Sequence, residues 1–217
     1  MRRAALLLLM LHAAPASAQE PLESKLIVQQ GGREVGREEF TLRQGRGRGL
    51  PGSTLIAAAR YPAASPTTQL AATLERTPGP EFGLAKFQLD VEGPAGTTVI
   101  LAAGSGARLI VRTVAKGSES GRELPGGPDV VLLDDQVFSL YAAVADLATP
   151  AGRPLTAIFP RTGKRASFTA RRESGSEGGA SRVTLSGELS GTLSTDGRGG
   201  VQRLELPGRG TVVTRAE

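Results

Sequence analysis

The chain has 217 residues, of which 26 are Lys or Arg and 21 are Asp or Glu, so its formal net charge is +5. It contains no Cys or Trp, and both its Met and its only His, His12, lie near the start of the chain. His is the usual general base near neutral pH, and Cys is the usual thiolate nucleophile and soft-metal ligand. Outside residues 1–18, the chain therefore has no His, Cys or Met. This absence excludes Ser-His-Asp and Cys-His catalysis as well as zinc, blue-copper and iron–sulfur sites, so we expect no enzyme, no metal and no cofactor.

Residues 1–18 have the three parts of a secretory signal peptide. Arg2 and Arg3 form a basic start, residues 4–14 are largely apolar, and residues 16–18 read Ala-Ser-Ala, a small-x-small cleavage pattern. The apolar stretch is too short to cross a bilayer, and no other segment approaches the roughly 20 apolar residues that a membrane helix needs. We therefore predict an exported protein without an integral membrane segment, located in the periplasm or elsewhere outside the cytoplasm of a bacterium.

Cleavage leaves residues 19–217, a length that fits a single β-rich domain. Its net charge is +3, because Arg2 and Arg3 are lost with the signal peptide. Without Cys, the domain has no disulfide and no lipid-attachment residue. The segment 43–49, Arg-Gln-Gly-Arg-Gly-Arg-Gly, has no interleaved aromatic residue, so we expect a loop there and no nucleic-acid partner.

Short alternating or β-rich runs separated by Gly, Pro and Ser fill most of the remaining chain, which is the pattern of an antiparallel all-β protein. In chain order, the predicted strands cover residues 24–30, 35–44, 53–61, 67–76, 84–92, 97–103, 107–116, 155–159, 164–173, 182–189, 201–206 and 211–215. Alternation is clearest where Phe87, Leu89 and Val91 share one face and Lys86 and Gln88 share the other. One face of such a sheet, its dry face, is apolar and shielded from water, so another element must pack against it.

One segment, residues 134–147, has the spacing of a helix face instead. Its apolar positions are Val137, Leu140, Tyr141, Val144 and Leu147. Asp134 is placed to cap the start of a helix of about four turns, which ends before Pro150. We therefore predict a mainly β fold in which a long, curved antiparallel sheet, a half-barrel, wraps around one central α-helix.

The order of these segments resembles exported bacterial half-barrel families of unknown function. The motifs that carry the resemblance are Gly-Gly at 31–32, Val-Gly-Arg-Glu-Glu-Phe at 35–40, Leu140-Tyr141 with Leu147, Asp-Gly-Arg-Gly-Gly-Val at 196–201 and Leu206-Pro207. Those families are distantly similar in architecture to the half-barrel carriers that ferry lipoproteins across the periplasm. The resemblance implies a binding role, it brings no active-site motif, and the chain departs from the carriers in having only six Phe and two Tyr.

The candidate pocket lies where the predicted helix faces the sheet. Its predicted lining consists of Val137, Leu140, Tyr141, Val144, Leu147, Phe87 and Leu89. Small residues such as those at 57–59 leave room beside the helix for an apolar ligand. They also let the sheet close tightly on the helix, and the dense packing of protein interiors favours that filled core.

These features predict a non-catalytic binding or carrier protein of the cell envelope that accepts an apolar, lipid-like moiety. One alternative is a structural or assembly factor that holds another envelope protein through its sheet edges or its arginines. A second, less favoured alternative is a hydrolase that uses the adjacent carboxylates Asp134 and Asp135. The same pair could bind calcium, but adjacent residues point apart and the helix cap explains them without a metal.

Overall fold

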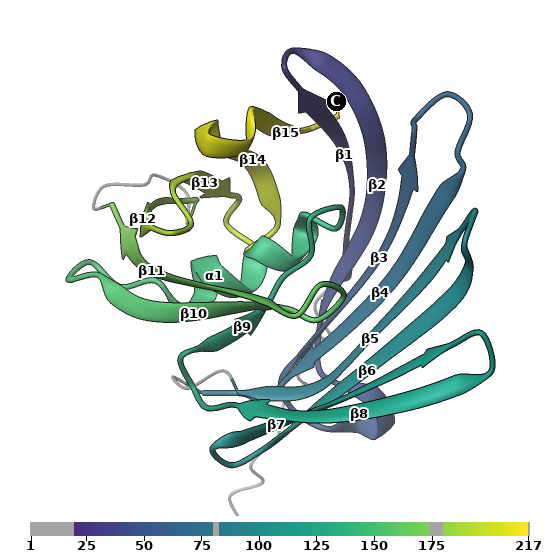
Figure 1. Ribbon diagram of the computed structural model, residues 1–217. Coiled ribbons are helices and arrows are strands. Elements are labelled where there is room, and N and C mark those ends of the chain that lie inside the picture. The colour runs from purple at the N-terminus through teal and green to yellow at the C-terminus, as the bar shows by residue number, and fades with distance from the viewer. Residues whose placement is uncertain (1–19, 80–82, 174–179, 217) are drawn as a thin grey trace, which may run out of the picture.

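The computed structural model describes residues 20–79, 83–173 and 180–216, so the predicted signal peptide lies outside the described residues (Figure 1). The described chain is mainly β. Its strands are β1 (Leu22–Gln30), β2 (Arg33–Gln44), β3 (Ser53–Tyr61), β4 (Thr68–Arg76), β5 (Leu84–Gly93), β6 (Gly96–Ser105), β7 (Arg108–Ala115), β8 (Ser118–Pro125), β9 (Val130–Leu132), β10 (Arg153–Phe159), β11 (Lys164–Arg172), β12 (Ser181–Gly187), β13 (Gly191–Thr195), β14 (Val201–Leu206) and β15 (Thr211–Arg215).

All these strands belong to one open sheet with the order β8-β7-β6-β5-β4-β3-β2-β1-β15-β14-β13-β12-β11-β10-β9. Neighbouring strands are antiparallel except β9 and β10, which run parallel. The first and last strands meet in the middle of the sheet, where Val28 pairs with Val213. We call β1–β8 the N-terminal arm and β9–β15 the C-terminal arm.

The alternation of apolar residues predicted strands at twelve places, and a strand is present at each of them. Three further strands, β8, β9 and β13, were not predicted. Strand β8 reads Ser-Glu-Ser-Gly-Arg-Glu-Leu-Pro and lies exposed at a sheet edge, so it has no dry face to impose a period of two. Strands β9 and β13 have three and five residues, too few to show a period.

The predicted helix over residues 134–147 is too long at its start. The structure has a 3-10 turn, η2 (Ser139–Tyr141), followed by the short helix α1 (Ala142–Leu147). Asp134 caps no helix, because its Oδ1 accepts a hydrogen bond from the backbone N–H of Gln136 at 2.8 Å, within a bend that precedes the helical turn. Within the described residues, no helix is long and apolar enough to cross a membrane.

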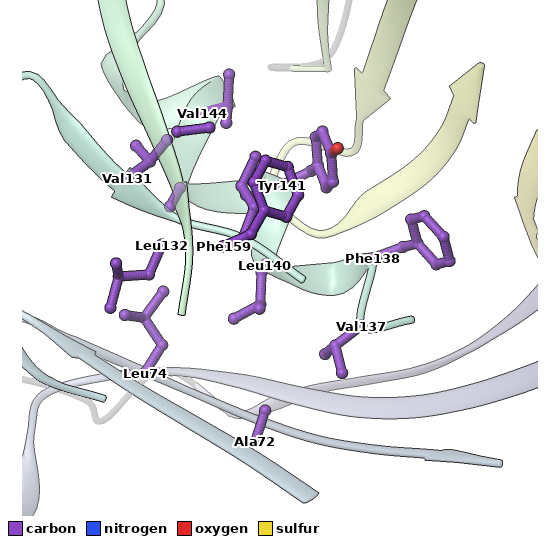
Figure 2. Packing of buried hydrophobic residues seen from close by; sticks show 14 of the residues in the cluster. Ala72, Leu74, Val131, Leu132, Val137, Phe138, Leu140, Tyr141, Val144 and Phe159 are labelled. Carbon is purple, nitrogen blue, oxygen red and sulfur yellow. The ribbon is translucent and has the colours of Figure 1, made fainter. Parts of the chain in front are cut away.

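The helical segment lies between the two arms of the sheet (Figure 1). Helix α1 contacts β11, β12 and β13 of the C-terminal arm, whereas η2 contacts β3 of the N-terminal arm. Figure 2 shows Val137 and Leu140 directed toward Ala72 and Leu74 of β4. The segment thus covers the dry face of both arms, and it belongs to one continuous cluster of buried apolar side chains.

The inner face of strand β2 has a glycine where the neighbouring strand carries a tyrosine ring. A Cβ built on Gly36 would lie 2.1 Å from Cε1 of Tyr61, so the ring occupies the space that a side chain would need. The hydroxyl of Tyr61 donates to the backbone carbonyl of Gln136 at 3.0 Å. The missing side chain at position 36 therefore lets Tyr61 lie across β2 and reach the chain that leads into η2.

We expect the substitution Gly36→Ala to lower the free energy of unfolding by about 1–3 kcal/mol, because the added methyl group displaces the Tyr61 ring. Gly121→Ala is the matched control: Gly121 also lies within a strand, and a Cβ there meets nothing within 4 Å. Its effect should stay within about 0.5 kcal/mol. Urea unfolding measures both variants, and equal effects of the two substitutions would contradict the proposed ring placement.

Candidate functional site

A pocket of about 690 Å³ opens between the two arms, beside the chain that enters η2. Its apolar lining consists of Val28, Val35, Tyr61, Pro62 and Phe138. The polar and charged lining consists of Gln30, Thr67, Thr68, Asp135, Gln136, Lys164, Arg209 and Thr211. The pocket therefore combines a patch of core side chains with a polar rim. A second hollow of about 620 Å³ lies over β1–β3 and is lined mainly by residues of the outer face, among them the ion pair of Lys25 with Glu39.

Two turns hold the walls of the pocket in place. The β1–β2 turn passes through Gly31 and Gly32, whose φ angles of 56° and 79° lie in the left-handed region that favours glycine. The N–H of Gly31 donates to the carbonyl of Gly210 at 2.9 Å, which ties this turn to the 3-10 turn η4 (Pro207–Arg209). The two arms are thus linked directly where the pocket opens.

A buried carboxylate lies behind the pocket. Glu38 of β2 is 0% exposed, and its Oε2 accepts the backbone N–H of Phe138 at 2.7 Å while its Oε1 accepts that of Ser139 at 3.0 Å. These N–H groups stand at the start of the helical turn and have no partner within it, so Glu38 caps the segment from the opposite strand. Burial raises the pKa of Glu38 to about 7; the hydrogen bonds from Ser139 and Phe138 oppose that shift, and the charge of Asp134 adds to it.

The adjacent carboxylates Asp134 and Asp135 are held by different arginines. Arg161 donates to both oxygens of Asp134, at 2.9 and 3.0 Å, and to Oε1 of Gln136 at 2.7 Å. Arg209 forms an ion pair with Asp135. Burial raises the pKa of Asp134, although the charge of Arg161 opposes this. In the part of the chain that the structure describes, no three side chains of the types that bind metals gather in one place.

The seven residues predicted to line a pocket are all placed in the packed interior. Val137, Leu140, Tyr141, Val144, Leu147, Phe87 and Leu89 are each at most 2% exposed. None of them is among the lining residues of the 690 Å³ pocket, whose aromatic lining consists of Phe138 and Tyr61.

The hydroxyl of Tyr141 is buried without a hydrogen-bond partner among the described residues, and this burial raises the pKa of Tyr141. An apolar ligand in contact with these seven residues stays a prediction.

The site predicted from the sequence does not include Glu38, Tyr61, Phe138, Lys164 or Arg209. One of them carried a signal: Phe40 and Leu42 of β2 point inward, so the period of two also places Glu38 on the dry face. A charged residue at such a position needs hydrogen-bond partners and is a candidate for a structural or functional role. The other four come together only in the folded chain.

No family model matches this sequence, and no match was found among curated proteins. Among solved structures, the chain is similar to the crystal structure of a DUF1089 family protein from Pseudomonas aeruginosa. The sequence identity is 14%, the TM-score is 0.40, and the overlap covers 93% of this chain and 97% of that chain. An overlap this loose adds nothing to the argument on function.

We expect the stability of the protein to fall as the pH rises through the range in which Glu38 titrates. The pKa of Glu38 is about 7 in the folded chain and 4.5 as its ordinary value, so between these values the folded state binds the extra proton. The free energy of unfolding should therefore decrease from about pH 4.5 to about pH 7, by up to about 3 kcal/mol. Urea unfolding at a series of pH values measures this slope.

Two glutamine variants identify the group responsible. Glu38→Gln should remove most of the slope near neutral pH, because an amide does not titrate, and the part that remains comes from buried carboxyls such as Asp134. Glu39→Gln, at the exposed neighbouring position, should keep it. An unchanged slope in Glu38→Gln would show that another group controls the pH dependence.

Proposed function

We propose that the protein is a non-catalytic, exported binding or carrier protein of the bacterial cell envelope whose half-barrel sheet accepts an apolar, lipid-like moiety. The observation that carries this proposal is the pocket between the arms, with Val28, Val35, Tyr61 and Phe138 in its lining. Its volume of about 690 Å³ falls within the range of roughly 300–1,000 Å³ that is usual for small-molecule sites. A site of this kind between the arms of a curved sheet corresponds to the mouth of a β-barrel, a common place for ligands.

The burial of the helical segment supports a binding role at the mouth of the half-barrel and not along its whole interior. Leu140, Tyr141 and Val144 are 0% exposed, so the space between the arms beside α1 is filled. The opening begins where the chain enters the helical segment, at Gln136 and Phe138. A ligand would therefore lay an apolar chain against Phe138 and Val35 and keep its polar end near the rim.

The charged groups near the pocket support binding over hydrolysis. Asp134 is 1% exposed and accepts hydrogen bonds from Arg161 at both oxygens, and Asp135 forms an ion pair with Arg209, so both carboxylates are already engaged by arginines within the protein. Glu38 is fully buried and does not line the pocket. A hydrolase built on these carboxylates is therefore the less supported alternative.

A structural or assembly role is the second candidate, and the edge strand β8 favours it. Strand β8 forms one end of the sheet, and seven of its eight residues are exposed. On the adjoining strand β7, Ile110 and Val114 are 46% and 37% exposed. An exposed edge can pair with a strand of another protein. Substitution of Ser120 by Pro within β8 would weaken such an envelope complex and leave ligand binding at the mouth of the half-barrel in place.

The binding proposal is tested with N-phenyl-1-naphthylamine, a neutral apolar dye whose fluorescence rises when it leaves water. Protein stripped of lipid should bind the dye, and Val35→Glu should weaken binding about tenfold or more because a charge then lies against the apolar lining. Ile56→Glu, on the outer face of β3, is the matched control and should bind like the original protein. Absence of dye binding, or equal weakening by both variants, would contradict the proposal.

A further inference from the structure

The rim of the pocket between the arms carries more positive than negative charge. Its charged side chains are Asp135, Lys164 and Arg209. Asp135 and Arg209 form an ion pair and offset each other. Lys164 is exposed at the start of β11, and its ammonium group has no ion-pair partner within residues 20–79, 83–173 and 180–216. The pocket thus presents one uncompensated cation beside its apolar lining.

Arg209 is held in a fixed orientation that leaves part of its guanidinium available. Its Nη1 pairs with Asp135, and its guanidinium carbon lies 5.2 Å from the centroid of the Phe159 ring. Its backbone belongs to η4, which the hydrogen bond from Gly31 to Gly210 ties to the β1–β2 turn. Among the described residues, Nε and Nη2 of Arg209 have no hydrogen-bond acceptor, so their N–H groups can donate to a planar or tetrahedral anion, which the fork-shaped guanidinium recognises well.

From this arrangement we infer that the ligand is an amphiphile with an anionic headgroup, a carboxylate or a phosphate, held by Lys164 and Arg209. The inference rests on the proposed binding function and specifies the class of ligand for the same pocket. The apolar chain lies against Val28, Val35 and Phe138, and the headgroup then lies at the rim among the two cations and the hydroxyl and amide groups of the lining. An amphiphile with a neutral headgroup would form no ion pair with Lys164 and would therefore bind more weakly.

A pair of fluorescent probes that differ only in head charge tests the inference. Dansyl-undecanoic acid carries a carboxylate at neutral pH, and its methyl ester has the same chain and fluorophore without the charge. The original protein should bind the acid about tenfold more tightly than the ester. In Lys164→Gln the ratio of the two affinities should fall toward one.

Lys86→Gln is the matched control, since Lys86 is an exposed strand lysine on the face of β5 opposite to Phe87. This variant loses the same charge and should keep the original preference for the acid. Equal affinities of the original protein for acid and ester would overturn the inference while leaving the proposed function intact. A loss of preference in Lys86→Gln as large as that in Lys164→Gln would also overturn it, because net charge would then be the cause. If neither probe binds, the proposed function itself fails.

Competition at constant ionic strength separates an amphiphile site from a site for free anions. Dodecyl phosphate should displace bound dansyl-undecanoic acid at concentrations at least about tenfold below those needed with inorganic phosphate, because the chain contributes its own burial. Equal displacement by the two competitors would mean that the rim binds small anions without the apolar lining, and the inference would be wrong.

Discussion

The structure depends on a buried carboxylate that fastens one arm of the sheet to the helical segment. Glu38 on β2 accepts the N–H groups of Phe138 and Ser139, about a hundred positions further along the chain. At the other end of the segment, Arg76 of β4 donates to Asp146 of α1 at 2.7 Å. The two contacts fix a short helical segment, which could not form on its own at this length, against the N-terminal arm. Because burial raises the pKa of Glu38 to about 7, the charge of this anchor changes near neutral pH, and the stability of the core depends on pH there.

The position of this anchor also explains where the interior is filled and where it is open. Beyond Ser139 the segment turns its apolar side chains into both arms, and the space between the arms is closed. Before Phe138 the chain bends through Asp135 and Gln136, which are engaged by Arg209, Arg161 and Tyr61 and not by a helix. The opening lies beside this bend. The proposed site is therefore a consequence of how the helical segment begins.

Much of the sheet could be predicted from the sequence because a strand with one dry face shows a period of two. The strands that could not be predicted, β8, β9 and β13, are an exposed edge or very short. The predicted start of the helix at Asp134 was wrong because the start of the segment is set by contacts between residues far apart in the sequence. Glu38 caps the helical segment, and Asp134 forms an ion pair with Arg161 instead. The apolar periodicity marked the side chains that fill the core, whereas the lining of the pocket comes from six strands, the β3–β4 loop, η4 and a bend, and no local pattern connects them.

The central claim is that a chain-bearing ligand lies between the arms, against the residues that precede the helical segment. Intermolecular nuclear Overhauser effects between the methylene protons of bound dodecyl phosphate and the assigned side chains of the protein locate that ligand directly. The account predicts contacts to Val28, Val35, Tyr61 and Phe138. Contacts confined to the outer face of the sheet, for example to Ile56 and Ile110, would contradict it.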